Sequence, residues 1–218
     1  MIELYIAVII TLIQLTSCYL RYLPFSTEIT IHERNLLIKS FLTWSVVDSL
    51  INLYFFSDDI NYRIFKITLY AGCAPYFLIS LAIIREKIPQ HVFVLGMQCL
   101  WCFMLHSLSG MVITILYGGM SEEFIPLQLS FYLVIFVLLL KLEQKFFIKL
   151  LPTPKMFENE QLKWAISLLP IAIFIGMTIS IVDSTFLPTW KGKLSRISIP
   201  LFFFTYISLI EFNNTSNN

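Results

Sequence analysis

The chain has 218 residues, of which 57% are hydrophobic and only 13% are charged, and its formal net charge is +1. A soluble domain has about 25% charged residues because its surface faces water, so this composition excludes an ordinary water-soluble domain. The near-zero net charge gives no reason to expect nucleic acid as a partner. We therefore expect an all-α polytopic membrane protein, a helix bundle whose main surroundings are the lipid bilayer.

Seven apolar runs are long enough, or nearly so, to cross the hydrocarbon core, which takes about 20 helical residues. Lipid offers the backbone no hydrogen bonds and the alternating polarity of a barrel strand is absent, so each run is predicted to be a helix. The last run reaches Glu211 after only about 21 Å of helix. Six spans plus an interfacial segment is therefore an alternative to seven. In chain order the predicted spans are residues 4–20, 38–56, 64–84, 92–117, 125–140, 164–182 and 197–212, with a polar tail at 213–218.

The first run is predicted to be a retained span, not a cleaved signal peptide. No Lys or Arg precedes it, it begins almost at Met1, and Thr16-Ser17-Cys18 is a poor cleavage site. Loops after the first, third and fifth predicted spans, counted with the adjoining ends of the spans, contain ten Lys and Arg residues, and the opposite loops, counted in the same way, contain five. Positively charged loops stay in the cytoplasm. We expect a multi-pass protein of the plasma membrane, with the N-terminus outside and the C-terminus cytoplasmic.

A basic segment follows the fifth predicted span. Lys141, Lys145 and Lys149 recur every four residues and share one helical face, while Phe146 and Phe147 lie on another. Two interpretations remain open. The segment is an amphipathic helix on the anionic leaflet, or it is the solvated end of the fifth span.

Asp48 is the only acidic residue in the middle of a predicted span. Ser45, Asp48, Ser49 and Asn52 share one face of that helix. A carboxylate in hydrocarbon is costly, so this face should point into the bundle or into a water-filled cavity. The functional hypothesis is a ligand contact or a switch at Asp48 and Asn52; the alternative is a neutralised or paired Asp that ties helices together.

The fourth predicted span has a second polar stripe, in which Gln98, Cys102, His106 and Gly110 recur every four residues. Gln98 and His106 are further candidates for ligand binding or switching. His106 could form a proton-sensitive hydrogen bond with Asp48 across helices, although a membrane His more often serves packing. Cys99 and Cys102 form a C-x-x-C pair, but apolar surroundings suppress thiolate reactivity, and we expect small-residue packing with no metal site.

Two acidic pairs are predicted in outward loops, Asp58-Asp59 and Glu122-Glu123. At the mouth of a bundle they would favour a cationic ligand or a peptide terminus through their local field. Ordinary solvated turns explain them equally well. No phosphate-binding loop, nucleophile elbow or H-E-x-x-H motif occurs, so we assign no catalytic residues and expect no cofactor.

A segment around the start of the fourth span runs from Ile84 to His106 and begins Ile84-Arg-Glu-Lys-Ile-Pro-Gln-His-Val-Phe-Val-Leu-Gly-Met-Gln98. This segment resembles the membrane sensor region of bacterial GHKL-type sensor histidine kinases, which include quorum-sensing receptors. Leu23-Pro24-Phe25 and Phe41-Leu-Thr-Trp44 fit the same resemblance, which extends over about the first 150 residues. It implies a signal-sensing bundle of six or seven helices, a homodimer, that responds to an extracellular peptide or small molecule within a two-component system.

The chain departs from that family at its end, because it stops at Asn218, where the family has its dimerisation helix and ATP-binding domain. None of His32, His91 or His106 is expected to accept a phosphoryl group, so the chain would be an enzyme only if a catalytic domain follows in the full-length protein. It is expected to be an excised sensor or a truncated relative. The alternative is a small transporter or an accessory membrane subunit that uses Asp48 and His106 in a proton or ion path.

Overall fold

A computed structural model describes residues 2–56, 68, 72–85, 87–119, 121–151 and 160–182. Within these ranges all regular elements are helical, which confirms the predicted all-α class. The predicted seventh span (197–212), the tail (213–218) and most of 57–71 lie outside the described residues. The elements are α1 (Ile2–Tyr22), η1 (Leu23–Phe25), α2 (Ile31–Phe55), α4 (Cys73–Ile83), α5 (Ile88–Tyr117), η2 (Glu122–Phe124), α6 (Ile125–Ile148) and α7 (Glu160–Val182).

Four of the described helices are long and apolar enough to cross a membrane. They correspond to the predicted first, second, fourth and fifth spans. Shorter apolar helices, Cys73–Ile83 and Lys163–Gly176, occur within the predicted third and sixth spans. The described residues therefore agree with a membrane protein of several helices, without establishing seven spans.

Two helices extend well beyond the apolar runs from which their spans were predicted. Helix α2 begins at Ile31, seven residues before the predicted start at 38, because Thr30 caps it: its hydroxyl accepts from the Glu33 backbone N–H, and the Glu33 carboxylate accepts from the Thr30 N–H. Helix α6 continues to Ile148, beyond the predicted end at 140. Hydropathy marks where the apolar stretch ends, whereas capping and backbone hydrogen bonds decide where the helix ends.

The chain forms two compact units. Unit 1 comprises Met1–Ile88 and Leu105–Leu150, and unit 2 comprises Pro89–Met104 and Leu151–Asn218. Helix α5 contributes its second half to unit 1 and its first half to unit 2.

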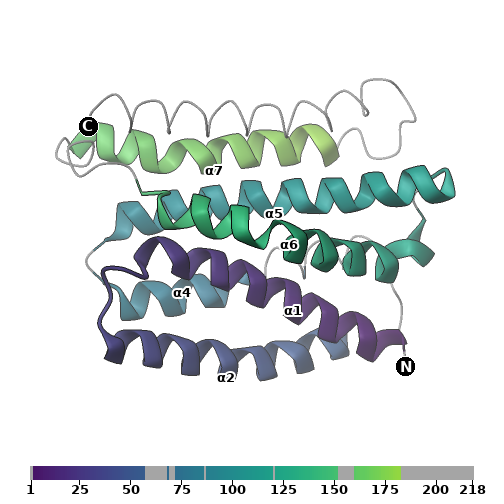
Figure 1. The fold of residues 1–218 in the computed structure, drawn as a ribbon, viewed down its shortest axis with the longest axis horizontal. Coiled ribbons are helices and arrows are strands. Elements are labelled where there is room, and N and C mark those ends of the chain that lie inside the picture. The colour runs from purple at the N-terminus through teal and green to yellow at the C-terminus, as the bar shows by residue number, and fades with distance from the viewer. Residues whose placement is uncertain are drawn as a thin grey trace. The chain divides into compact units, whose positions relative to one another are not determined.

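In unit 1, helix α1 lies between α2 and α6 and also contacts α4 (Figure 1). Helices α1 and α6 run in the same direction with a constant offset. The Tyr5 and Ser130 hydroxyls are 2.6 Å apart, and the Gln144 amide donates to the Tyr19 hydroxyl at 2.7 Å. Both pairs are 125 residues apart in sequence, so the two helices keep one register over about four turns.

Helix α2 has the polarity expected in lipid, which is the reverse of a soluble helix. Its buried face includes Ser45, Asp48 and Asn52, while Val46 and Leu50 on the other side are each 63% exposed. Exposed apolar side chains also cover α1 and α6. A surface of this kind is stable where hydrocarbon, not water, surrounds it.

Unit 2 brings the first half of α5 against α7. At Gly96, an added Cβ would lie 2.7 Å from both the Pro170 Cβ and the Ile171 backbone nitrogen. Farther along, the rings of Phe103 and Phe174 meet edge to face, with centroids 6.2 Å apart. Gly96 thus lets the two helices approach closely at Pro170, which lies inside α7.

Candidate functional site

Asp48 lies in the interior of unit 1, as its position in the sequence predicted. Asp48 is 3% exposed, and its carboxyl group accepts a hydrogen bond from the Asn52 side-chain amide at 3.2 Å. The two residues are one helical turn apart on α2. Asn52 is fully buried, so this pair is shielded from the surroundings of the bundle.

Thr11 of α1 connects this pair to the neighbouring helix. Its hydroxyl accepts from the Asn52 amide at 3.2 Å and donates to the Ala7 carbonyl at 3.0 Å. It also lies 3.0 Å from the Ser49 hydroxyl, whose single proton is shared with the Ser45 carbonyl at 2.9 Å. One donor and two acceptor positions are all that a hydroxyl has. Thr11 therefore fixes the Asn52 amide in one orientation, with both of its N–H groups used.

Helix α1 has a buried polar face that was not predicted from the sequence. Thr11, Gln14, Ser17 and Arg21 are all at most 5% exposed and recur every three or four residues. That spacing is the signal that could have found them, because it places the four side chains on one helical face. Arg21 also stacks on Phe77, with its guanidinium carbon 4.7 Å from the ring centroid.

His106 belongs to a second polar cluster in unit 1, between α5 and α6. The Gln128 amide nitrogen donates to the His106 backbone carbonyl at 3.3 Å and lies 3.4 Å from Nε2 of the imidazole. The Ser109 hydroxyl donates to the same carbonyl at 2.8 Å. Gly110 leaves the space that Gln128 needs, since a Cβ there would lie 3.2 Å from its amide nitrogen. Gln128 was not predicted from the sequence.

The hydrogen bonds of Asp48 and His106 lead to different partners. Asp48 bonds to Asn52, and the His106 ring lies against Gln128. Within the described part of the chain, Asp48 and His106 do not form a hydrogen bond with each other. The predicted stripe on α5 is also divided, because Gln98, 4% exposed, belongs to unit 2 and His106 to unit 1.

The acidic pairs predicted at the outer mouth are described only in part. Asp58 and Asp59 lie outside the described residues. Glu122 and Glu123 form the first two residues of η2, and Glu123 is exposed, as a solvated turn requires. Among the described residues, no group of three His, Cys, Asp or Glu side chains lies close enough together to hold a metal ion.

The basic segment at 141–149 is the end of α6. Lys141, Lys145 and Lys149 are exposed, whereas Glu143 and Phe147 are fully buried within unit 1. The structure agrees with the second interpretation, in which the basic segment is the end of the fifth predicted span.

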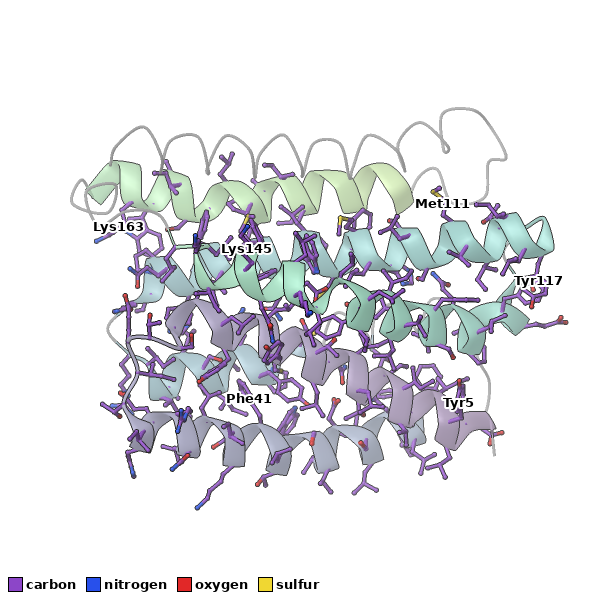
Figure 2. All side chains as sticks on the ribbon, viewed as in Figure 1. Tyr5, Phe41, Met111, Tyr117, Lys145 and Lys163 are labelled. Atoms are coloured by element: carbon purple, nitrogen blue, oxygen red, sulfur yellow. The ribbon has the colours of Figure 1, made fainter. Side chains whose placement is uncertain are left out.

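The two ends of unit 1 differ in charge. Lys87 and Glu28 form an ion pair that brings the loop before α5 beside the loop before α2, and the Tyr19–Gln144 hydrogen bond brings the end of α6 to the same end. Figure 2 shows Lys145 toward this end of unit 1 and Tyr5 and Tyr117 at the opposite one. The Lys and Arg residues that the structure describes in unit 1 all lie in the half nearest the first end: Arg21, Arg34, Lys39, Arg85, Lys87, Lys141, Lys145 and Lys149.

Comparison with protein families, with curated proteins and with solved structures gives no match for this chain. The site therefore has to be interpreted from its own chemistry.

Proposed function

We propose that the chain is a membrane signal-sensing domain that resembles the sensor region of GHKL-type histidine kinases. The observation that supports this proposal is the hydrogen-bonded network of Asp48, Asn52 and Thr11 between α1 and α2. A buried polar network in a helix bundle has few alternative arrangements, so a ligand that changes its hydrogen bonds changes the packing of the helices.

In this proposal an extracellular peptide or small molecule approaches from the outer face, where Glu122 and Glu123 favour a cationic group. It shifts the population between two packed states of the bundle. Asp48, Asn52 and His106 respond in unit 1, and Gln98 in unit 2. The signal leaves through the cytoplasmic end of a homodimer, to a kinase of a two-component system.

The proposed orientation places the basic end of unit 1 in the cytoplasm and the N-terminus outside, since positively charged loops are retained in the cytoplasm. Labelling of intact cells with a membrane-impermeant maleimide tests this. Ser121→Cys, in the turn before η2, is expected to react, and Ser26→Cys, in the turn after η1, is expected to react only after permeabilisation. The reverse pattern would exclude this orientation.

Sensing is tested by fusing the whole chain to the output domain of a well-behaved histidine kinase and measuring autophosphorylation against fractionated peptide and small-molecule extracts of growth medium. We expect one fraction to change the output at least several-fold, and Asp48→Asn to abolish that change. Ser80→Ala is the matched control, because the buried Ser80 hydroxyl donates only to a carbonyl of its own helix. An output indifferent to every fraction would contradict the proposal.

Transport is the second candidate function, because a buried carboxylate can relay protons or ions. Proteoliposomes with a pH-sensitive dye inside distinguish the two. Proton flux that depends on Asp48, together with an unresponsive kinase fusion, would favour a transporter or an accessory subunit of one.

A further inference from the structure

Three oxygen-bearing side chains are buried in the interior of unit 1, and two of them have an oxygen that accepts no hydrogen bond from the described residues. Asp48, Asn52 and Gln14 are 3%, 0% and 0% exposed. Neither Oδ1 of Asn52 nor Oε1 of Gln14 accepts a hydrogen bond from any residue that the structure describes. Buried acceptors without a donor cost free energy, so their surroundings call for a positively charged or hydrogen-bonding partner.

Both amides are held with their oxygen atoms in fixed orientations. The two N–H groups of Asn52 are used by Asp48 and Thr11, and Thr11 has no second proton with which to bond a flipped amide. The Gln14 amide nitrogen donates to the Thr68 carbonyl at 3.2 Å. Gly72 keeps that space open, because a Cβ there would lie 2.0 Å from the Gln14 nitrogen.

Gln14 and Asp48 come level with each other in the bundle, about one helical turn from Asn52. Thr11 of α1 contacts Asn52 of α2, and the two helices run in opposite directions because a short turn joins them. Gln14 is about one turn after Thr11, and Asp48 is about one turn before Asn52. Both steps lead toward the same end of unit 1, so Gln14 comes level with Asp48.

Asp48 has no ion-pair partner among the described residues. A carboxylate in a low-dielectric interior requires a compensating positive charge or loses its own. One monovalent cation neutralises one carboxylate, whereas a divalent cation would leave a net positive charge buried. Carboxylate and amide oxygens are suitable ligands for alkali metal ions inside membrane proteins.

We propose that Asp48, Asn52 Oδ1 and Gln14 Oε1 form a binding site for a monovalent metal cation, of the sodium or potassium class, between α1 and α2. Binding stabilises the packed arrangement of these helices by mass action. Cation binding itself does not depend on the proposed sensing function. Only an effect of the bound cation on the signal would rest on that function.

The test uses the full chain in nanodiscs of zwitterionic phosphatidylcholine, at constant pH and ionic strength. N-methylglucamine chloride is replaced stepwise by NaCl or KCl, and unfolding is followed by tryptophan fluorescence. We expect the unfolding temperature to rise with the metal ion and to saturate. Asp48→Asn is expected to lose this rise, and Ser80→Ala is expected to retain it.

A second variant and a direct probe cover the case in which Asp48→Asn does not fold. Gln14→Leu is expected to raise the half-saturating concentration at least tenfold, and line broadening of ²³Na resonances by the wild-type chain is expected to decrease to the same extent. An unfolding temperature that ignores the alkali ion would overturn the site, as would a larger response to CaCl₂ than to NaCl or KCl. A cation-dependent shift with an unresponsive kinase fusion would support the site and count against sensing.

Discussion

The described contacts between helices in unit 1 differ in kind from those in unit 2. In unit 1, side chains of α1 hydrogen-bond to α2 and α6, through Thr11 with Asn52 and Tyr19 with Gln144. In unit 2, α5 and α7 meet through the close approach of Gly96 to Pro170 and the contact of two Phe rings. Lipid is as apolar as a Leu side chain, so hydrophobic burial distinguishes little between packed and separated helices. Polar contacts and close van der Waals packing are the two means that remain: Thr11 and Tyr19 provide the first in unit 1, and Gly96 provides the second in unit 2.

The largest expected effect comes from the buried charges of unit 1. Glu143 of α6 is 0% exposed and Arg21 of α1 is 2% exposed. The register of α1 and α6 brings Glu143 within about one turn of Arg21. We expect Glu143→Leu to cost about 3–5 kcal/mol in the free energy of unfolding, because the buried guanidinium loses compensation. SDS-induced unfolding in mixed micelles measures this cost.

The double variant Glu143→Leu with Arg21→Met is the control for that experiment. If the two charges compensate each other, it recovers most of the lost stability. Additive losses would show that the two residues act independently. The pair would then contribute nothing to the polar coupling between α1 and α6.

The close approach in unit 2 is expected to give the next largest effect. Gly96→Val places a branched side chain where even a Cβ meets backbone atoms at under 3 Å, and overpacking of this kind costs about 1–3 kcal/mol. Gly176→Ala on α7 is the matched control, since no atom of the described residues lies within 4 Å of its added Cβ. Proteolysis of the α7 segment and SDS-induced unfolding both measure the change. Equal stability of the two variants would show that the close approach at Gly96 does not contribute to the packing of α5 against α7.

Breaking the α1–α2 network is expected to cost less. Asn52→Leu removes both hydrogen bonds to Asp48 and Thr11, and such bonds within membranes are worth about 0.6 to 2 kcal/mol. Ser80→Ala should change the free energy of unfolding by only a few tenths of that amount. A loss in Asn52→Leu no greater than in Ser80→Ala would mean that packing, not hydrogen bonding, joins α1 to α2.

The smallest effect is expected at the opposite end of the α1–α6 interface. Tyr5→Phe removes the exposed hydrogen bond to Ser130 and keeps the ring, so we expect a loss of about 0.5 kcal/mol or less. Double-mutant analysis with Ser130→Ala measures the coupling. A coupling as large as that between Glu143 and Arg21 would show that the strength of the polar contacts in unit 1 does not increase with their burial.

Several features of the candidate site could be predicted from single helices. Asp48 and Asn52 are one turn apart on the only span with a central carboxylate, and lipid forces such a face inward, as observed. The buried face of α1 could have been found in the same way. Gln128 could not, because nothing in the sequence indicates that α6 presents it to His106.

The sequence by itself determined that the chain is helical, that several of its helices are long and apolar enough to cross a membrane, where most of these helices lie, and that Asp48 faces the interior. Each of these follows from local physics: too few charges to cover a soluble surface, the length needed to cross lipid, and the cost of a charge in hydrocarbon. Only the tertiary structure decided that Asp48 and His106 have separate partners, that α1 supplies Thr11 and Gln14 to the polar interior, and that Gly96 meets Pro170. These facts depend on which helices are neighbours and at what register, and helical periodicity within one span contains neither.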